Sequence, residues 1–208
     1  MNKTVALSSL TVTNLLPLAS VIATAAGAGL DILPYGNAAL AVFTNAAPSA
    51  GTNPTLAVKL QTSQDTNTVA EVVYVGTGTG SLQVECGPDP VAEDITFTAS
   101  SATSFAVAGV TTGAIGTLTV GTPFVSAQVR ALILAGGEAF VSTDVFTVTT
   151  AAREWVDVVS FAILGASATS QSRVLQLDKL GRFLRAHKTI GGTVNPAYTC
   201  TLQLLASV

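Results

Sequence analysis

Turn-forming residues recur at short intervals from Gly76 to Thr150, and this spacing constrains the fold more than any other feature of the sequence. The apolar-alternating runs between these turns are about five or six residues long, the usual length of a β-strand. A helical layer has no room in such a segment, so residues 76–150 are predicted to form a closed β-domain. The expected strands are Gln83–Cys86, Glu93–Ala99, Ser104–Val107, Gly116–Val120, Val129–Leu134 and Val145–Thr149.

The sequences on the two sides of this segment resemble each other in their strand patterns and differ from the segment itself. They therefore predict one β-domain that is interrupted by an insertion. Thr55–Ser63 alternates apolar and polar residues, as a half-buried antiparallel strand does. The other expected strands are Leu30–Leu33, Ala38–Thr44, Ala70–Val75, Trp155–Leu164, Arg173–Leu177, Arg182–Ile190 and Ala197–Leu205. We therefore expect an all-β chain with a discontinuous β-domain of residues 1–75 and 151–208 as its base. Residues 76–150 would form a second small sandwich or barrel inserted into it.

Two segments allow a second interpretation. The N-terminus imitates a secretory signal, but Asn14 and Pro17 interrupt its apolar run. We expect instead a strand at Thr4–Thr13 within an N-terminal arm of about residues 1–28. Ser170–Phe183 carries leucines at helical spacing, but Gly181 and the flanking patterns favour a strand, a turn and a second strand.

Composition indicates contact with other proteins. Charged residues make up only 10% of the chain, whereas about a quarter is usual. No apolar run reaches the length of a transmembrane helix, and a net charge of −3 gives no signature of nucleic-acid binding. Cys86 and Cys200 fall in different expected domains, so two separate thiols are favoured over a disulfide.

No motif predicts catalysis, a cofactor or a metal. Gly76–Gly80 lacks the spacing of a phosphate-binding loop and no helix follows it, so we expect a hinge leading into the insertion. Asp89, Glu93 and Asp94 lie close together but lack the spacing of a calcium loop. His187 is the single histidine, and a sheet-edge or interface role is its default. We expect a protein that is not an enzyme.

Basic residues concentrate near the C-terminus. Solvated strand edges would explain them, since lysine and arginine discourage edge-to-edge pairing. Alternatively they dock onto an acidic protein surface, with Arg182 and Arg185 binding carboxylates in bidentate fashion. Nucleic acid is disfavoured because no aromatic platform accompanies the charges. The residues concerned are Arg173, Lys179, Arg182, Arg185 and Lys188.

Several stretches resemble proteins of tailed-bacteriophage virions. The pattern from Thr96 to Val148, including GTLTVGTPF, LILAGGEAF and VSTDVFTV, resembles a small β-domain inserted into phage capsid and decoration proteins. The flanking segments DILPYGNAALAV, TLAVKLQTS and LGRFLRAHKTIGGTVNPAYT resemble jelly-roll-like phage head-surface proteins. One departure is Ser142-Thr143-Asp144, where such insertions usually have Gly-Asp, so a positive φ at position 143 is in doubt.

The resemblance implies a jelly-roll-like β-sandwich for the base of residues 1–75 and 151–208. It also implies a capsid decoration, or cement, protein on the outer surface of the phage head. Its partner would be the major capsid protein, and the chain itself would form a dimer or trimer. The expected contacts are the C-terminal basic residues and the N-terminal segment, including Thr4, Val5 and Leu7, which could pair with a neighbour's sheet edge. No membrane, nucleic-acid or cofactor partner is expected. Two alternatives stay open: a tail or fibre component of the virion, and a secreted bacterial surface or carbohydrate-binding β-protein.

Overall fold

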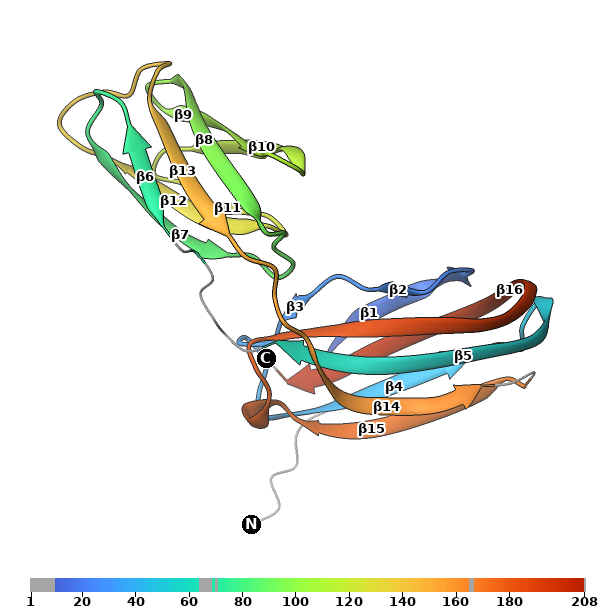
Figure 1. The fold of residues 1–208 in the computed structure, drawn as a ribbon. Coiled ribbons are helices and arrows are strands. Elements are labelled where there is room, and N and C mark those ends of the chain that lie inside the picture. Colours follow the sequence, from blue (N-terminus) through green and yellow to red (C-terminus); the bar gives the residue numbers. More distant parts are fainter. Residues whose placement is uncertain (1–9, 64–68, 70, 165–166, 208) are drawn as a thin grey trace, which may run out of the picture. The chain divides into compact units, whose positions relative to one another are not determined.

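The chain folds into two units built from β-strands. The computed structural model describes residues 10–63, 69, 71–164 and 167–207 (Figure 1). The base unit comprises residues 1–65 and 154–208, and the inserted unit comprises residues 66–153. The described residues hold no helix that is long and apolar enough to span a membrane. The predicted all-β class is confirmed.

The base unit is one antiparallel ribbon of four long chain segments. The central segment is β16, which pairs on one side with β5 and then β4, and on the other side with β3, β2 and β1. The outermost segment consists of β14, which pairs with β5, and β15, which pairs with β4. The strands are β1 (Leu10–Val21), β2 (Ala25–Ala26), β3 (Leu30–Asp31), β4 (Ala38–Asn45), β5 (Ala50–Ser63), β14 (Val156–Leu164), β15 (Thr169–Gln176) and β16 (Phe183–Ser207).

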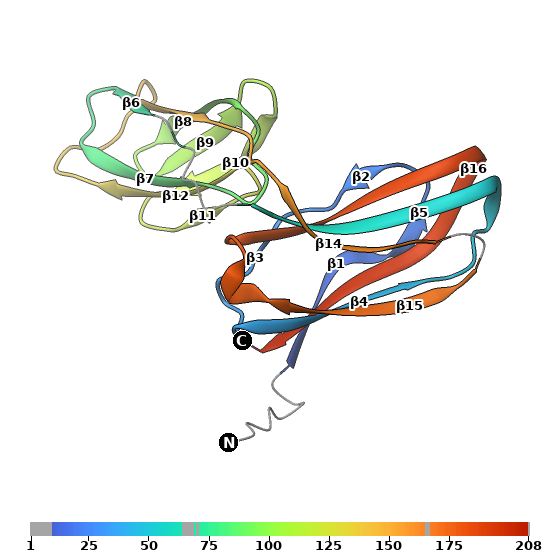
Figure 2. The same cartoon turned by 60° about the horizontal axis from the view of Figure 1, so that its bottom comes forward.

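This ribbon is folded across its middle into two facing sheets, as the course of β16 shows (Figure 2). The fold lies where Thr193 of β16 pairs with Thr52 of β5. Gly51, Asn53 and Gly192, which flank this pair, have φ values of 107°, 48° and 112°. Ordinary residues seldom adopt such values. These residues therefore let the ribbon turn while its pairing continues on both sides.

The resulting strand order is that of a jelly roll. Sheet A contains β1, the second half of β16, β4 and β15 in that order, and sheet B contains β2 with β3, the first half of β16, β5 and β14. If the halves of β16 are counted as the seventh and eighth strands, the orders are 1-8-3-6 and 2-7-4-5. Two sheets with this connectivity form the double Greek key of jelly rolls. The insertion lies between the fourth and fifth strands, β5 and β14.

Alternation along the strands builds the core of the base unit. Along β4, Ala39, Ala41 and Phe43 are buried, whereas the residues between them face outward. The Phe43 ring lies 5.5 Å from the ring of Phe161 on β14, so the two sheets contact each other directly. Tyr198 is also fully buried. Burial of each large side chain stabilises the fold by about 1.5–3 kcal/mol.

The inserted unit also has two sheets. One has the order β10-β9-β8-β13-β6 and the other β11-β12-β7. Phe97 and Phe105 are fully buried in its core, and the ring of Phe105 meets that of Phe140 edge-on at 4.9 Å. The strands are β6 (Val72–Val75), β7 (Gly80–Cys86), β8 (Glu93–Ser101), β9 (Ser104–Gly109), β10 (Gly113–Thr119), β11 (Phe124–Val125), β12 (Val129–Ala135) and β13 (Val145–Thr150).

Three expectations about strands and boundaries need correction. Leu10–Val21, placed in an N-terminal arm, is a strand of sheet A, because Leu15, Leu16 and Val21 are buried in the core. Strand β6, assigned to the base, belongs to the inserted unit, where it pairs with β13. The two expected C-terminal strands are the single strand β16.

The predicted strand, turn and strand over 170–183 is confirmed. A short 3₁₀ turn at Leu177–Lys179 (η2) separates β15 from β16. The helical spacing of leucines in this segment does not produce an α-helix. Leu175 is buried as part of strand β15, and Leu177 is buried as part of the 3₁₀ turn.

Candidate interaction surface

An apolar row crosses the outer face of sheet A. Leu40 of β4 lies in register with Leu205 of β16 on one side and with Val174 of β15 on the other. Val12 of β1 is in turn the partner of Leu205. Side chains in register on one face of a sheet are neighbours, so these four form one line across all four strands. Val12, Leu40 and Val174 are exposed by 54%, 37% and 76%, and Leu205 is half-buried.

The residues around the apolar row are neutral. Gln203 donates a hydrogen bond from Nε2 to Oδ1 of Asn14, at 3.2 Å. No aspartate, glutamate, lysine or arginine occupies an outward register position among the described residues of this face. The neighbouring outward positions are Leu10, Ser207, Ala38 and Gln176 on one side of the row, and Asn14, Gln203, Val42, Ser172, Thr201, Thr44 and Ser170 on the other. An apolar centre that lacks charge and has a polar rim is the pattern of protein–protein interfaces.

The outer face of sheet B carries charge instead. Asp157 of β14 accepts hydrogen bonds from Lys59 Nζ at 2.5 Å and from Gln61 Nε2 at 2.9 Å, and these bonds lower the pKa of Asp157. Arg185 donates from Nε to Gln61 Oε1 at 3.0 Å and lies 4.1 Å over the ring of Trp155. His187 pairs with Lys59 on one side and Ala26 on the other, so it lies inside the sheet and not at its edge.

The basic residues expected to dock a partner are dispersed over the base unit. Arg173 is on β15, with its guanidinium 5.8 Å from the Phe161 ring, and Lys179 is on η2 beside Asp178. Lys188 shares the inward register of Ala186 and borders a hollow beside β1. The structure therefore does not gather these side chains into one patch.

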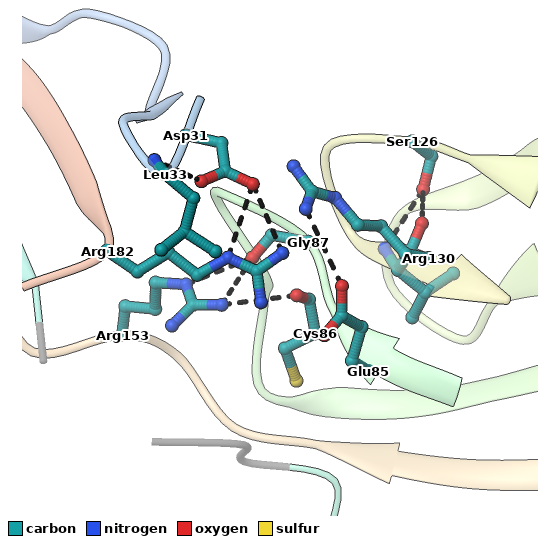
Figure 3. A network of polar contacts seen from close by, with 10 residues as sticks. Asp31, Leu33, Glu85, Cys86, Gly87, Ser126, Arg130, Arg153 and Arg182 are labelled. Atoms are coloured by element: carbon teal, nitrogen blue, oxygen red, sulfur yellow. Dashed lines mark hydrogen bonds and ion pairs between the residues drawn. The ribbon is translucent and has the colours of Figure 1, made fainter. Parts of the chain in front are cut away.

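Arg182 is paired within the chain. It donates from Nε and Nη2 to Asp31 Oδ2 at 3.2 and 3.1 Å, and the second oxygen of Asp31 accepts from the amide of Leu33 at 3.1 Å (Figure 3). A bond from Arg182 to a partner's carboxylate would compete with this pair, and one from Arg185 would compete with Gln61 and Trp155. Thr4, Val5 and Leu7, the other expected contacts, lie outside the described residues.

In the inserted unit, the glycine-rich loop holds an internal carboxylate. Asp144 is fully buried and accepts hydrogen bonds from the amides of Thr77 at 2.8 Å, Gly78 at 3.1 Å and Val141 at 2.8 Å. A Cβ at Gly78 would lie 2.6 Å from Asp144 Oδ2, so the close approach requires glycine. The hinge predicted at Gly76–Gly80 is therefore wrong, because Asp144 fixes this loop.

The same contacts set the protonation of Asp144. Burial would raise the pKa of its carboxyl, but hydrogen bonds from the Val141, Thr77 and Gly78 amides outweigh burial and lower the pKa. Position 143 has no positive φ, since Asn53 is the one non-glycine residue with such a value in the described chain. The sequence signals for this interaction were Asp144, just before β13, and the glycines of residues 76–80.

The other polar groups of this unit also close loops. Glu93 accepts hydrogen bonds from the amides of Thr111 at 2.6 Å and Thr112 at 2.9 Å, and from the Thr112 hydroxyl. The Thr112 hydroxyl is the main reason that the pKa of Glu93 is lowered. Arg153 donates to the carbonyl oxygens of Cys86 and Gly87 (Figure 3). No cluster of three or more potential metal ligands occurs among the residues that the structure describes.

Acid is expected to destabilise the inserted unit. The pKa values of Asp144 and Glu93 are lower in the folded chain than in the unfolded one. Their stabilisation is therefore complete above the unfolded values, about 3.9 and 4.3, and is lost as the pH falls through the folded values. We expect a constant melting midpoint from pH 7 to about 5 and a steep decrease below about pH 4. Melting curves of the wild type and of Glu93→Gln test this, and an equally steep decrease in the variant would contradict the role of Glu93.

Comparisons with known proteins give no family. No protein-family model and no curated protein matches the chain. Two crystal structures of FlgL from Xanthomonas campestris align at 19% and 21% identity, with TM-scores of 0.34 and 0.32. Each alignment covers 48% of this chain but only 32% and 33% of FlgL, so the chain spans about a third of that protein. VP17, a capsid protein of bacteriophage P23-77, aligns over 96% of this chain and 97% of its own, at 8% identity and a TM-score of 0.16. None of these scores establishes a common fold.

Proposed function

We propose that the chain is a structural protein of a tailed-phage virion that decorates the outer surface of the head. The observation that carries the proposal is the neutral outer face of sheet A, with its apolar row of Val12, Leu205, Leu40 and Val174. Viral capsid domains are among the proteins that use jelly rolls. Because one fold hosts many functions, the uncharged face, and not the fold, is the main argument for protein contact.

Three carboxylates of the inserted unit accept hydrogen bonds from the chain itself, and this favours a role without catalysis. A general acid or nucleophile must reach a substrate atom. The carboxylates of Asp144 and Glu93 instead accept several hydrogen bonds from the backbone around them. Asp94 accepts a bond from the Thr149 hydroxyl at 2.6 Å. Each of these acids thereby stabilises a turn or a strand pair.

Decoration makes use of modest contacts. A shell offers many equivalent sites, and a protein held at two of them binds the second at high effective concentration. A protein with only 10% charged residues and a neutral outer face on sheet A suits such repeated contact. The proposed partner is the major capsid protein.

Binding to heads tests this proposal. The purified full chain is sedimented with heads of its phage before and after shell expansion, over a range of concentrations. We expect saturable binding to expanded heads at a fixed ratio to the shell protein. Absence of binding to both forms would refute decoration, and recovery on isolated tails would favour the tail or fibre alternative.

One feature favours carbohydrate binding as a second candidate function. The inserted unit has a hollow of about 480 Å³ at β7, β11 and β12. It is lined by the ion-paired side chains of Glu85 and Arg130, by Gln83, and by the apolar residues Phe124 and Leu132. Hydrogen-bonding groups beside an apolar surface suit a neutral sugar, which has hydroxyls and a C–H face. Screening of the wild type against a glycan array would separate this candidate from head decoration.

A further inference from the structure

We infer that the outer face of sheet A binds the same face of a second copy of this chain, giving a face-to-face dimer. The inference rests on one part of the proposed function, namely that this face contacts protein. It assigns this face to a second copy of the chain, so the dimer would contact the shell protein through its remaining surfaces. It does not depend on the virion. The argument concerns symmetry, charge and area.

The apolar row is complementary to itself. Its ends are Val12 and Val174, and its centre is Leu205 and Leu40. A two-fold axis that runs between two copies and parallel to their strands places Val12 of one copy over Val174 of the other, and Leu205 over Leu40. A two-fold interface uses one surface on both subunits and so requires such a match. Sheets that pack in this way lie about 10 Å apart, with their strands within about 30° of each other.

The charge distribution favours this face over the outer face of sheet B. In a two-fold interface each charge meets the equivalent surface of the other copy, and like charges repel. The described outward positions of sheet A carry no charged side chain, and the Asn14–Gln203 pair beside the row is neutral. Sheet B presents Lys59 and Arg185 with Asp157, which would be partly desolvated at a cost.

The available area is sufficient for a weak dimer. Strands β4 and β15 are each eight residues long. Four strands about 4.8 Å apart, with a rise of about 3.4 Å per residue, cover about 19 by 27 Å, or roughly 500 Å² per copy. Two such faces bury about 1,000 Å², near the lower limit for a specific interface. We therefore expect dissociation on dilution through the micromolar range.

Sedimentation velocity of the full chain from about 1 to 200 μM tests the inference. Wild type is expected to convert from monomer to dimer as concentration rises. Val174→Lys should raise the dissociation constant at least about tenfold, because the ammonium would face the valine of the other copy. Val174 is 76% exposed on an edge strand, so the lysine is tolerated in the monomer. The control is Val156→Lys, at the start of β14 in sheet B and 57% exposed. It lies away from the outer face of sheet A and should leave the constant unchanged.

Folding of each variant is verified by near-UV circular dichroism and by Trp155 fluorescence. A wild type that stays monomeric at all concentrations, or that forms a trimer, overturns the inference. Weakening by Val156→Lys but not by Val174→Lys would also overturn it, by placing the contact away from the outer face of sheet A. Sedimentation without heads leaves decoration untouched, whereas a dimer that fails to bind heads refutes decoration and retains this interface.

Discussion

Asp144→Ala is expected to lower the melting midpoint of the inserted unit by roughly 10–20 °C, since buried donors that lose their acceptor are costly and a small domain melts several degrees lower for each such loss. The amides of Thr77, Gly78 and Val141 all donate to this carboxylate. Its removal releases the β6–β7 loop, which contains Gly76, from the turn before β13, which contains Asp144. These two segments are far apart in the sequence.

Thermal unfolding followed by circular dichroism measures this effect. Asp144→Asn keeps the size of the side chain but turns an amide group toward the donors, so we expect a smaller decrease of the same sign. The matched control is Glu138→Ala, because Glu138 is an exposed residue of the neighbouring loop, and its midpoint should stay within about 2 °C of wild type. If Asp144→Ala melted like this control, the carboxylate would not be what holds the loop.

Phe43→Ala should destabilise the base unit by about 3–5 kcal/mol, the usual cost of truncating a buried phenylalanine. Phe43 is fully buried on β4, and its ring meets that of Phe161 on the opposite sheet at 5.5 Å. The cavity left by the truncation would lie between the two sheets of the jelly roll, where few atoms can move to fill it. We expect a lower urea midpoint, with little change in the m-value, the slope of the unfolding free energy against urea concentration.

Fluorescence of Trp155, the single tryptophan, reports this transition because the residue belongs to the base unit. Val42→Ala provides the comparison: Val42 is adjacent on β4 but faces outward and is half-buried, so it should cost less than about 1 kcal/mol. Equal losses in the two variants would mean that the Phe43–Phe161 contact does not hold the sheets together.

Local patterns were sufficient for many strands. Alternation marked Ala38–Thr44 and Val145–Thr149, and the structure has β4 at Ala38–Asn45 and β13 at Val145–Thr150. The strand, turn and strand around η2 was likewise predictable, because Gly181 and the flanking strand patterns outweighed the leucine spacing. Steric preferences and side-chain direction act within a few residues, so a short window of sequence contains this information.

Partners across long sequence separations were not predictable in the same way. Strand β6 joined the inserted unit because its Tyr74 ring packs 4.5 Å from Phe146. The carboxylate that fixes the glycine-rich loop lies 66 positions beyond Gly78. Arg182 forms an ion pair with Asp31, which is 151 positions away in the sequence. Such pairs depend on how the strands come together, and no local preference encodes them.

The candidate surface makes the same division clear. Val12, Leu40, Val174 and Leu205 are ordinary outward residues of four distant segments, and nothing in each segment alone distinguishes them. The sequence by itself determined that strands form, which residues alternate, and that little charge is available for the exterior. The tertiary structure decided the register, which aligns these four side chains on sheet A and brings Lys59, Gln61 and Arg185 together on sheet B. Register is a non-local property, because it follows from packing the buried face of every strand at once.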